Sequence, residues 1–339
     1  MSNQTPTLAS VVVDSGPTPI QRRATGRFRR LWQTFGPVAI FLAVFLMISA
    51  VNPNFLTGGG MGIVASLAAP ILMIALGQAM VLNVGSIDLS NAAMGLLGAI
   101  LLALSLSRWG VISPLLILLV TTGFGVINGL FVAYTKVPSF ALTLGTLGIF
   151  QSAALIFSDA TAVYVPGNSD FLGLLHTTRL AGVPVSFLMG VVIAVLLWGL
   201  LRFTGVGRGM TAIGLNETGA IFSGLSNRGL KVVAFGLSGL MSGFAAILII
   251  SQAGSASPNG LGSDLLLPGI AAAIVGGTSI VGGSTNPINV IFGALTVSLI
   301  PIANAVLEVG AQAQSMVYGL AIIIIAALMM NGSRNGIVK

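Results

Sequence analysis

Long apolar stretches alternate with short polar ones along nearly the whole chain. Each apolar stretch has about 20 residues, the length that a helix needs to cross roughly 30 Å of hydrocarbon. Such spans must be helical because lipid satisfies no backbone hydrogen bond, and the alternation typical of a transmembrane barrel is not seen. The pattern predicts an all-α polytopic membrane protein with about ten transmembrane helices, some of them broken at glycine-rich stretches. The expected spans are 31–51, 62–82, 90–107, 113–134, 139–157, 185–203, 231–251, 265–281, 287–306 and 314–331.

The composition agrees with a membrane location. Charged residues make up 6% of the 339 positions and apolar residues 55%, which leaves too few charges to cover a soluble globule. Glycine occurs 45 times and is dense inside the spans, as in "GFGVING" and "GLSGLMSGF". Since lipid supplies no hydrophobic drive between helices, we expect these glycines to let helices pack closely.

The basic residues lie at the ends of apolar runs and indicate the orientation of the chain. Ten crossings with both termini in the cytoplasm leave only Arg108 and Arg179 outside. The inner segments then hold Arg22, Arg23, Arg27, Arg29, Arg30, Lys136, Arg202, Arg208, Arg228, Lys231, Arg334 and Lys339. The net charge of +7 therefore serves topology, and a nucleic-acid partner is not expected.

The two ends of the chain are polar. We expect 1–30 to be a disordered cytoplasmic tail, 31–331 the transmembrane domain, and 332–339 a second cytoplasmic tail. A cleaved signal peptide with a cut at Ala50 is the alternative, but the basic region lies late and Ile48 fits the cleavage rule poorly. An uncleaved first span is favoured.

The most polar internal stretch is "GLNETGAIFSGLSNRGLK", from Gly214 to Lys231. Asn216 is expected to cap a short helix whose first turn holds Glu217, near the positive end of the helix dipole. Leu215, Phe222 and Leu225 would share one face. Such an amphipathic helix either lies flat on the membrane or docks into a groove of another protein.

Two further stretches are expected to interrupt spans. In "LNVGSIDLSNAAMGLLGAI", Gly85 can break a helix and Asp88 or Ser90 can cap the next one. An aspartate near membrane depth is also a functional candidate, although capping is favoured over substrate contact. In "GSDLLLPGIAAAIVGGTSIVGGSTNPINVIFGAL", the helix break is expected as a tight turn or a cavity lining. Its residues are Gly276, Gly277, Thr278 and Ser279.

Several kinds of chemistry are excluded or poorly supplied. The chain has no cysteine and one histidine, His176, so no metal site is expected. Its only lysines are Lys136, Lys231 and Lys339, and none belongs to a phosphate-binding P-loop. No nucleophile, base and orienting group occur together, so the chain is not expected to be an enzyme or to bind a cofactor.

The stretches at 82–100, 214–231 and 262–295, in their order along the chain, resemble the signatures of the ribose-type sugar permeases of binding-protein-dependent ABC importers. The resemblance extends from "NPNFLT" at 52–57 through the last span. It implies a permease subunit of the bacterial inner membrane, paired with itself or with a similar permease. It also implies an extracytoplasmic solute-binding protein and a separate ATPase subunit that uses ATP and Mg.

In that family the polar loop, here at about 204–230, is the coupling element that seats on the ATPase. The implied coupling residues are Asn216, Glu217, Phe222, Ser223, Gly224 and Leu225. The chain departs from the family pattern at Leu215, Gly219 and Ile221, and Ser86 stands where a second glycine is usual. Ser284, Thr285 and Asn286 replace the basic residue that usually follows the second glycine pair.

A sugar path needs hydrogen-bonding and aromatic side chains within the spans. Each such residue can also form a hydrogen bond between helices, and for any single one that interpretation is favoured over substrate contact. The candidates are Gln78, Asn83, Asn128, Phe140, Thr143, Thr146, Gln151, Gln252 and Asn304, together with Gly85, Asp88, Ser90 and the break at 276–279.

Two other kinds of transporter stay open. A branched-chain amino-acid permease shares the architecture but is not expected to show "IDLS". A proton-coupled secondary transporter would use Asp88 and Glu308 as a relay. A lipid-modifying enzyme is disfavoured because the catalytic set is missing. The few charges along the path favour a neutral sugar or polyol.

Overall fold

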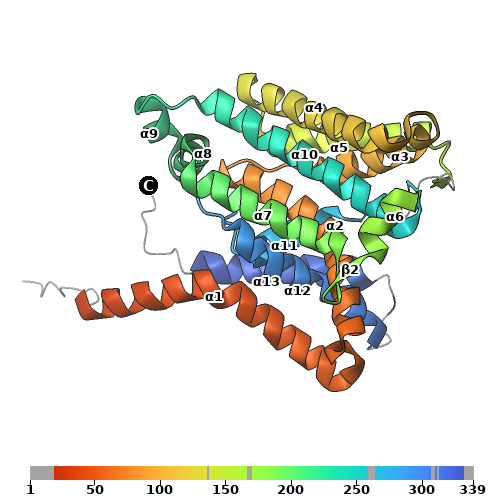
Figure 1. Cartoon of the computed structure of the whole chain (residues 1–339). Helices are drawn as coiled ribbons and strands as arrows, with labels where there is room; N and C mark the ends of the chain where they lie inside the picture. Colours follow the sequence, from red (N-terminus) through yellow and green to blue (C-terminus); the bar gives the residue numbers. More distant parts are fainter. Residues whose placement is uncertain are drawn as a thin grey trace, which may run out of the picture. The chain divides into compact units, whose positions relative to one another are not determined.

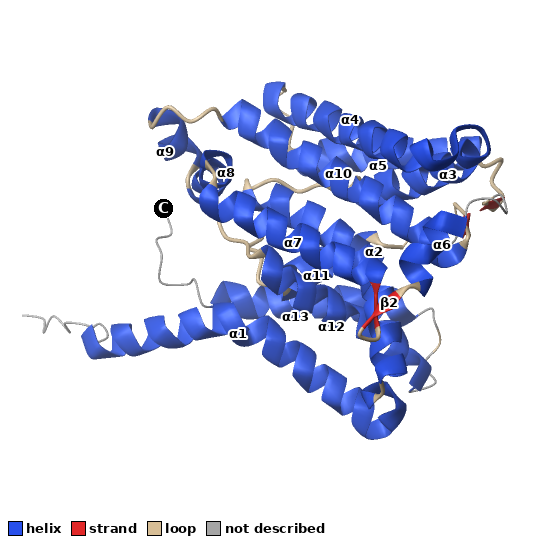
Figure 2. Cartoon of the chain, in the orientation of Figure 1, coloured by secondary structure: helices blue, strands red, loops and turns tan. Residues whose placement is uncertain are grey.

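A computed structural model describes residues 19–135, 137–165, 170–258, 264–306, 310 and 313–331. The chain divides into two compact units at Pro37, which lies inside the first helix. Figure 2 shows that the described residues are almost entirely helical, as the apolar pattern predicts. The segments 1–18 and 332–339, Lys136 and Glu308 lie outside the described residues.

A helix occupies each of the ten expected spans. Six stretches are long and apolar enough to cross a membrane, and one of them, Asn91–Tyr134, covers two consecutive helices. The chain is therefore a multi-pass membrane protein. The ten helices are α1 Pro19–Val51, α2 Gly58–Asn83, α3 Asn91–Trp109, α4 Ser113–Tyr134, α5 Ser139–Phe157, α7 Val185–Phe203, α10 Asn227–Ala253, α11 Leu266–Val275, α12 Pro287–Val306 and α13 Gln314–Asn331.

Shorter elements connect these helices. Two 3-10 turns cover Pro53–Leu56 and Gly110–Ile112, and short helices form α6 Asp170–Thr177, α8 Gly205–Leu215 and α9 Glu217–Phe222. The described strands are two-residue antiparallel pairs: β1 Val163–Tyr164 with β4 Ser255–Ala256, and β2 Arg179–Leu180 with β3 Val183–Pro184.

Two expectations about the spans are corrected. Helix α1 begins at Pro19, so its first turns lie within the segment expected to be a flexible tail. Helix α11 ends at Val275, short of the expected 281, because the chain turns at Gly277 with a φ of 84°. Its 10 residues rise about 15 Å, which is roughly half of the hydrocarbon thickness.

Helix α10 lies at the centre of the second unit, against α2, α3 and α4 (Figure 1). Glycines bring α10 and α4 into backbone contact, because a Cβ on Gly125 would lie 2.3 Å from the carbonyl oxygen of Phe235. A Cβ on Gly239 would lie 2.2 Å from the carbonyl oxygen of Thr121. The expected role of glycine in close helix packing is confirmed for this pair.

The apolar core is centred on α2. Buried side chains of α2 pack with those of α7, α10, α11 and α12 in one cluster. Leu72, Met73 and Ile74, which point in three different directions around α2, are all fully buried. A helix that is apolar all round and buried all round has no lipid face. Helix α2 therefore anchors the segments that follow it, including the break that begins at Val84.

Candidate functional site

The three polar or glycine-rich stretches of the sequence meet at one place in the fold. The amide of Gly283 donates to the carbonyl of Asn83 at 3.0 Å. Gly214, at the end of α8, fits between them, since its Cβ would lie 2.0 Å from the Asn83 oxygen and 2.3 Å from the Gly283 nitrogen. A Cβ on Gly282 would lie 2.9 Å from the α-carbon of Gly85. We call Gly85, Gly214, Gly282 and Gly283 the glycine junction.

The loop between α11 and α12 is a sequence of tight turns. Gly277, Gly282 and Gly283 have φ angles of 84°, 103° and 70°, a region that glycine occupies without strain. The hydroxyls of Thr278 and Thr285 lie 2.7 Å apart, and the amide of Ser279 donates to the carbonyl of Ser284 at 2.8 Å. The sequence left open whether this break forms a tight turn or lines a cavity, and the structure has the turn.

Helix α9 is the short capped helix that the polar stretch predicts. The side chain of Asn216 accepts a hydrogen bond from the amide of Gly219 at 2.9 Å, and Gly224, with a φ of 82°, ends the helix. The hydroxyl of Ser223 donates back to the carbonyl of Gly219 at 2.9 Å.

The exposed apolar face of α9 differs in part from the expected one. Leu215, Ile221 and Phe222 are 71%, 50% and 87% exposed. Leu225, expected on the same face, is only partly exposed, because the chain turns at Gly224 before reaching it. We define the three exposed side chains, Leu215 at the end of α8 and Ile221 and Phe222 on α9, as the apolar patch.

Glu217 faces the fold rather than the apolar patch. Its Oε1 accepts hydrogen bonds from the Nζ of Lys231, at 2.9 Å, and from the side-chain amide of Asn227. The hydrogen bond from Lys231 lowers the pKa of Glu217 below its ordinary value. Both partners belong to the first turns of α10, so the pair ties α9 to α10.

Asp88 lies fully buried in the break between α2 and α3. Its Oδ1 accepts from the amide and the hydroxyl of Ser90 at 2.9 and 2.6 Å, and its Oδ2 accepts from the hydroxyl of Ser238 at 2.9 Å. Ser90 makes no side-chain cap on α3. Of the two expected caps, Asp88 is the one that holds the start of α3, and it also ties the break to α10.

Helix α5 is fastened to the same break by hydroxyl groups. The amide of Ile87 donates to Ser139 at 3.0 Å, and the amide of Leu89 donates to Thr143 at 3.1 Å. Thr143 thus bonds between segments, as expected for most polar residues within the spans. Sequence reasoning missed Ser139. The available signal was its position directly after Pro138, at the start of a span, where a hydroxyl is free to bond outside its own helix.

Asn128 of α4 bonds to both neighbouring segments. Its side-chain amide donates to Ser90 at 2.9 Å and to Thr146 at 3.2 Å. Asn83 and Gln78 also bond between segments. The side-chain amide of Asn83 donates to Thr211 at 3.2 Å, and the side-chain oxygen of Gln78 accepts from Asn91 at 3.4 Å. The buried Asn304 and the partly exposed Gln252 do not line the pocket described next.

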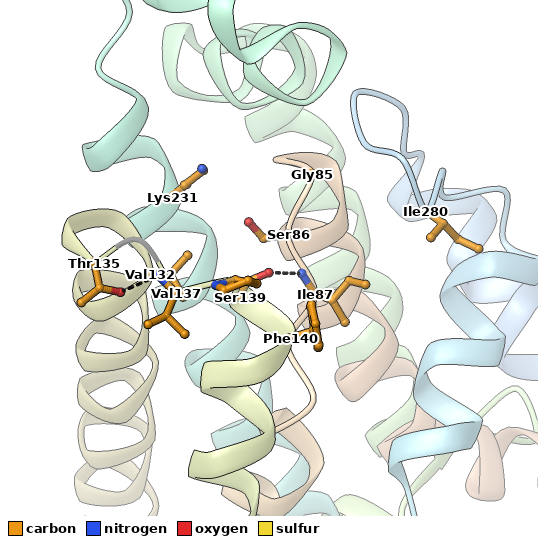
Figure 3. A pocket seen from close by; sticks show the side chains of 11 residues that line it. Gly85, Ser86, Ile87, Val132, Thr135, Val137, Ser139, Phe140, Lys231 and Ile280 are labelled. Carbon is orange, nitrogen blue, oxygen red and sulfur yellow. Dashed lines mark hydrogen bonds between the residues drawn. The ribbon is translucent and has the colours of Figure 1, made fainter. Parts of the chain in front are cut away.

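A pocket of about 440 Å³ opens beside the break (Figure 3). Its lining comes from the break after α2, the end of α4 and the start of α5, with Ile280 from the turn loop and Lys231 from α10. Among the described residues of the lining, Lys231 is the charged one. The lining residues are Gly85, Ser86, Ile87, Val132, Thr135, Val137, Pro138, Ser139, Phe140, Lys231 and Ile280.

The face of α5 that leads away from this pocket is open. Phe140 and Gln151 are exposed, and a Cβ on Gly145 or Gly148 would meet nothing within 4 Å. Only 17% of the most apolar window of α5 is buried. Among the sequence candidates, Phe140 and Gln151 have exposed side chains, whereas Asp88, Ser90 and Asn128 are engaged in hydrogen bonds.

Nothing in the described part of the chain points to a metal centre, because no group of three acidic, histidine or cysteine side chains comes together there. His176 lies on α6, apart from both the pocket lining and the glycine junction.

Comparison with known proteins gives a family and several relatives. Residues 60–326 match the family described as "Branched-chain amino acid transport system / permease component". The ribose import permease of Haemophilus influenzae is 30% identical over 90% of this chain and 94% of its own length. The D-allose and L-arabinose transport system permeases of Escherichia coli are 31% and 33% identical, over 89% and 90% of this chain and 93% and 92% of theirs. The chain thus belongs to the permease components of this transport family.

Proposed function

We propose that this chain is the permease subunit of an ATP-driven ABC importer and forms the path for a sugar or sugar-like solute. The observation that carries the proposal is α9, a capped helix in a loop between two spans. The side chains of Ile221 and Phe222 on this helix, and of Leu215 just before it, are exposed. Exposed apolar patches of this kind serve as contacts with another protein. The chain has no P-loop of its own, so ATP and Mg are used by the ATPase that docks on this patch.

The relatives support a sugar over a branched-chain amino acid. The family description names amino-acid transport, but the relatives carry the names of ribose, D-allose and L-arabinose permeases. They match this chain over nearly its whole length. We extend their substrate class, a neutral polyhydroxy compound, to this chain.

The pocket has the chemistry that such a solute requires. Ser86, Thr135 and Ser139 bring hydroxyl groups to it, and Phe140 brings an aromatic face. The described part of the lining includes no acidic residue, which suits an uncharged substrate better than a cation. The path therefore runs along the open face of α5 and leaves through this pocket on the cytoplasmic side.

A second permease subunit completes the path. Gln151 exposes a polar amide well inside α5, and a polar group that faces lipid is costly. The open glycines Gly145 and Gly148 permit close approach of another helix. We propose that a second copy of the chain, or a similar permease, covers this face of α5, with water between the two subunits. An extracytoplasmic binding protein delivers the solute from the opposite side.

The alternative of a proton-coupled carrier has less support. Both carboxylate oxygens of Asp88 accept hydrogen bonds, from Ser90 and Ser238, in a pattern that holds three segments together. A proton relay needs a carboxylate that changes partners. Asp88 is better explained as a fixed anchor of the break.

Uptake by reconstituted vesicles tests the proposal. The complete transporter, with its ATPase and binding protein, is supplied with labelled pentoses, hexoses, polyols and branched-chain amino acids. We expect concentrative uptake of a sugar or polyol that requires ATP and is lost when the ATPase is inactivated. Uptake of an amino acid alone, or uphill transport by vesicles that contain only this chain, would overturn the proposal.

A further inference from the structure

We propose that Lys231 is a positioning residue that passes the position of α9 to the cytoplasmic mouth of the pocket. The inference rests on the proposed function and adds to it the role of one residue. Two contacts of Lys231 carry it: an ion pair with Glu217 on α9, and a place in the pocket lining.

The ion pair joins α9 to α10, two separate helices. Glu217 belongs to the first turn of α9, and Lys231 lies one turn into α10. Their side chains are 49% and 16% exposed, so water screens the pair and it adds little to fold stability. Its effect lies in geometry, because a 2.9 Å contact holds the ammonium group at one point between α9 and the pocket.

The ammonium group of Lys231 has no other carboxylate within salt-bridge distance among the described residues. If α9 shifts when the ATPase closes, the ammonium group follows Glu217 or loses its partner. In both cases the charge at the mouth of the pocket changes position. Figure 3 shows Lys231 and Ile280 on opposite sides of the pocket, with Ser86 between them.

The glycine junction gives α9 a fixed pivot for this movement. Gly214 precedes α9 by three residues and is held against Asn83 and Gly283 by backbone contacts. Displacement of α9 therefore turns it about one end, while Glu217 moves relative to α10. Helix α9 thus has two attachments. The glycine junction is the pivot, and the ion pair with Lys231 links the position of α9 to the pocket.

The absence of cysteine from the sequence allows a direct measurement. Ser86→Cys is nearly isosteric and places a single thiol in the pocket lining, where Ser86 is 4% exposed. The rate of its modification by a water-soluble maleimide is measured in the complete transporter, without nucleotide and with ATP and vanadate. Leu180→Cys, on the outer hairpin and 62% exposed, is the matched control.

With Lys231 present, we expect the modification rate of the pocket thiol to change about five- to tenfold between the two nucleotide states. In Lys231→Met the change disappears while ATP hydrolysis continues, and Lys231→Arg restores it. Glu217→Gln removes the negative charge of the ion pair from the α9 side and should act as Lys231→Met does. The control thiol should react at one rate in every variant.

The outcomes separate this inference from the proposed function. A nucleotide response that persists in both Lys231→Met and Glu217→Gln overturns the inference and leaves the importer intact. The absence of any nucleotide response in the parent chain, together with no ATP-dependent uptake, overturns the proposed function itself.

Discussion

Gly214 and Asn83 meet backbone to backbone, although they lie on segments far apart in the sequence. A side chain on Gly214 would place its Cβ 2.0 Å from the Asn83 carbonyl oxygen, far inside contact distance. The neighbouring atoms are backbone and have no free rotamer to adopt. This contact connects the loop that carries α9 with the breaks after α2 and α11.

Substitution of Gly214 by alanine should therefore damage transport. Overpacking of a tight contact costs about 1–3 kcal/mol, so we expect a loss of ATP-driven uptake of about five- to 150-fold. Gly205→Ala on the same helix is the control, since its Cβ would meet nothing within 4 Å. Equal uptake by the two variants, at equal amounts in the membrane, would contradict the glycine junction as a constraint.

The apolar patch on α9 should determine the affinity for the ATPase. Phe222→Ala removes the most exposed aromatic side chain of the patch, and loss of an interface anchor costs about 2 kcal/mol, or roughly 30-fold in affinity. Thermal unfolding of the isolated subunit should not change, because Phe222 is 87% exposed. Binding of purified ATPase to the detergent-solubilised subunit measures the effect, with Leu180→Ala as the control that should bind normally.

Asp88→Asn should lower the thermal stability of the subunit. The amide brings two donors to a place where Ser90 and Ser238 already donate, and a lost hydrogen bond to a charged group costs about 1.5–3 kcal/mol. Ser238→Ala removes one partner and should cost less. Thermal unfolding in detergent measures both variants. A fully stable Asp88→Asn protein with altered response to a proton gradient would instead favour the carrier alternative.

Uptake should depend little on pH across the neutral range. The pKa of Glu217 is lowered by the hydrogen bond from Lys231, so the contribution of the pair is fully present above the ordinary glutamate pKa. It is lost only as the pH falls through the lowered value. We expect constant ATP-driven uptake between about pH 5.5 and pH 8, measured with equal pH on both sides of the vesicle. A steep change within that window would assign the coupling to another group.

The exposed amide of Gln151 should matter for transport and not for folding. Gln151→Leu removes a hydrogen-bonding group from the open face of α5, and we expect reduced sugar uptake with unchanged thermal unfolding. Ile156→Ala on the same helix, where Ile156 is 73% exposed, serves as the control. If Gln151 faces lipid, the leucine variant will be at least as stable and equally active, which would contradict the proposed path.

The sequence predicts those features that depend on nearby residues. Apolar runs locate the helices, because a span of about 20 residues is a local property. Asn216 and Gly224 mark the start and end of α9 because capping acts within one turn. The resemblance of three ordered motifs leads to the family for the same reason, since each motif is contiguous.

The tertiary structure decides which apolar face is buried. Helices α2 and α5 both read as apolar spans, yet 78% of one window and 17% of the other are buried. Lipid and protein interior are equally apolar, so hydropathy cannot distinguish them. The early end of α11 likewise depends on a turn that contacts Asn83, a residue distant in sequence.

The candidate site divides in the same way. The sequence alone determined that Asp88, Glu217 and the glycine pairs were unusual for their surroundings. Only the fold decided that Asp88 bonds to Ser238, 150 positions away, and that Glu217 turns inward to Lys231. Polar side chains in a membrane find partners wherever helices cross, and crossings are set by packing between distant segments, which no local pattern encodes.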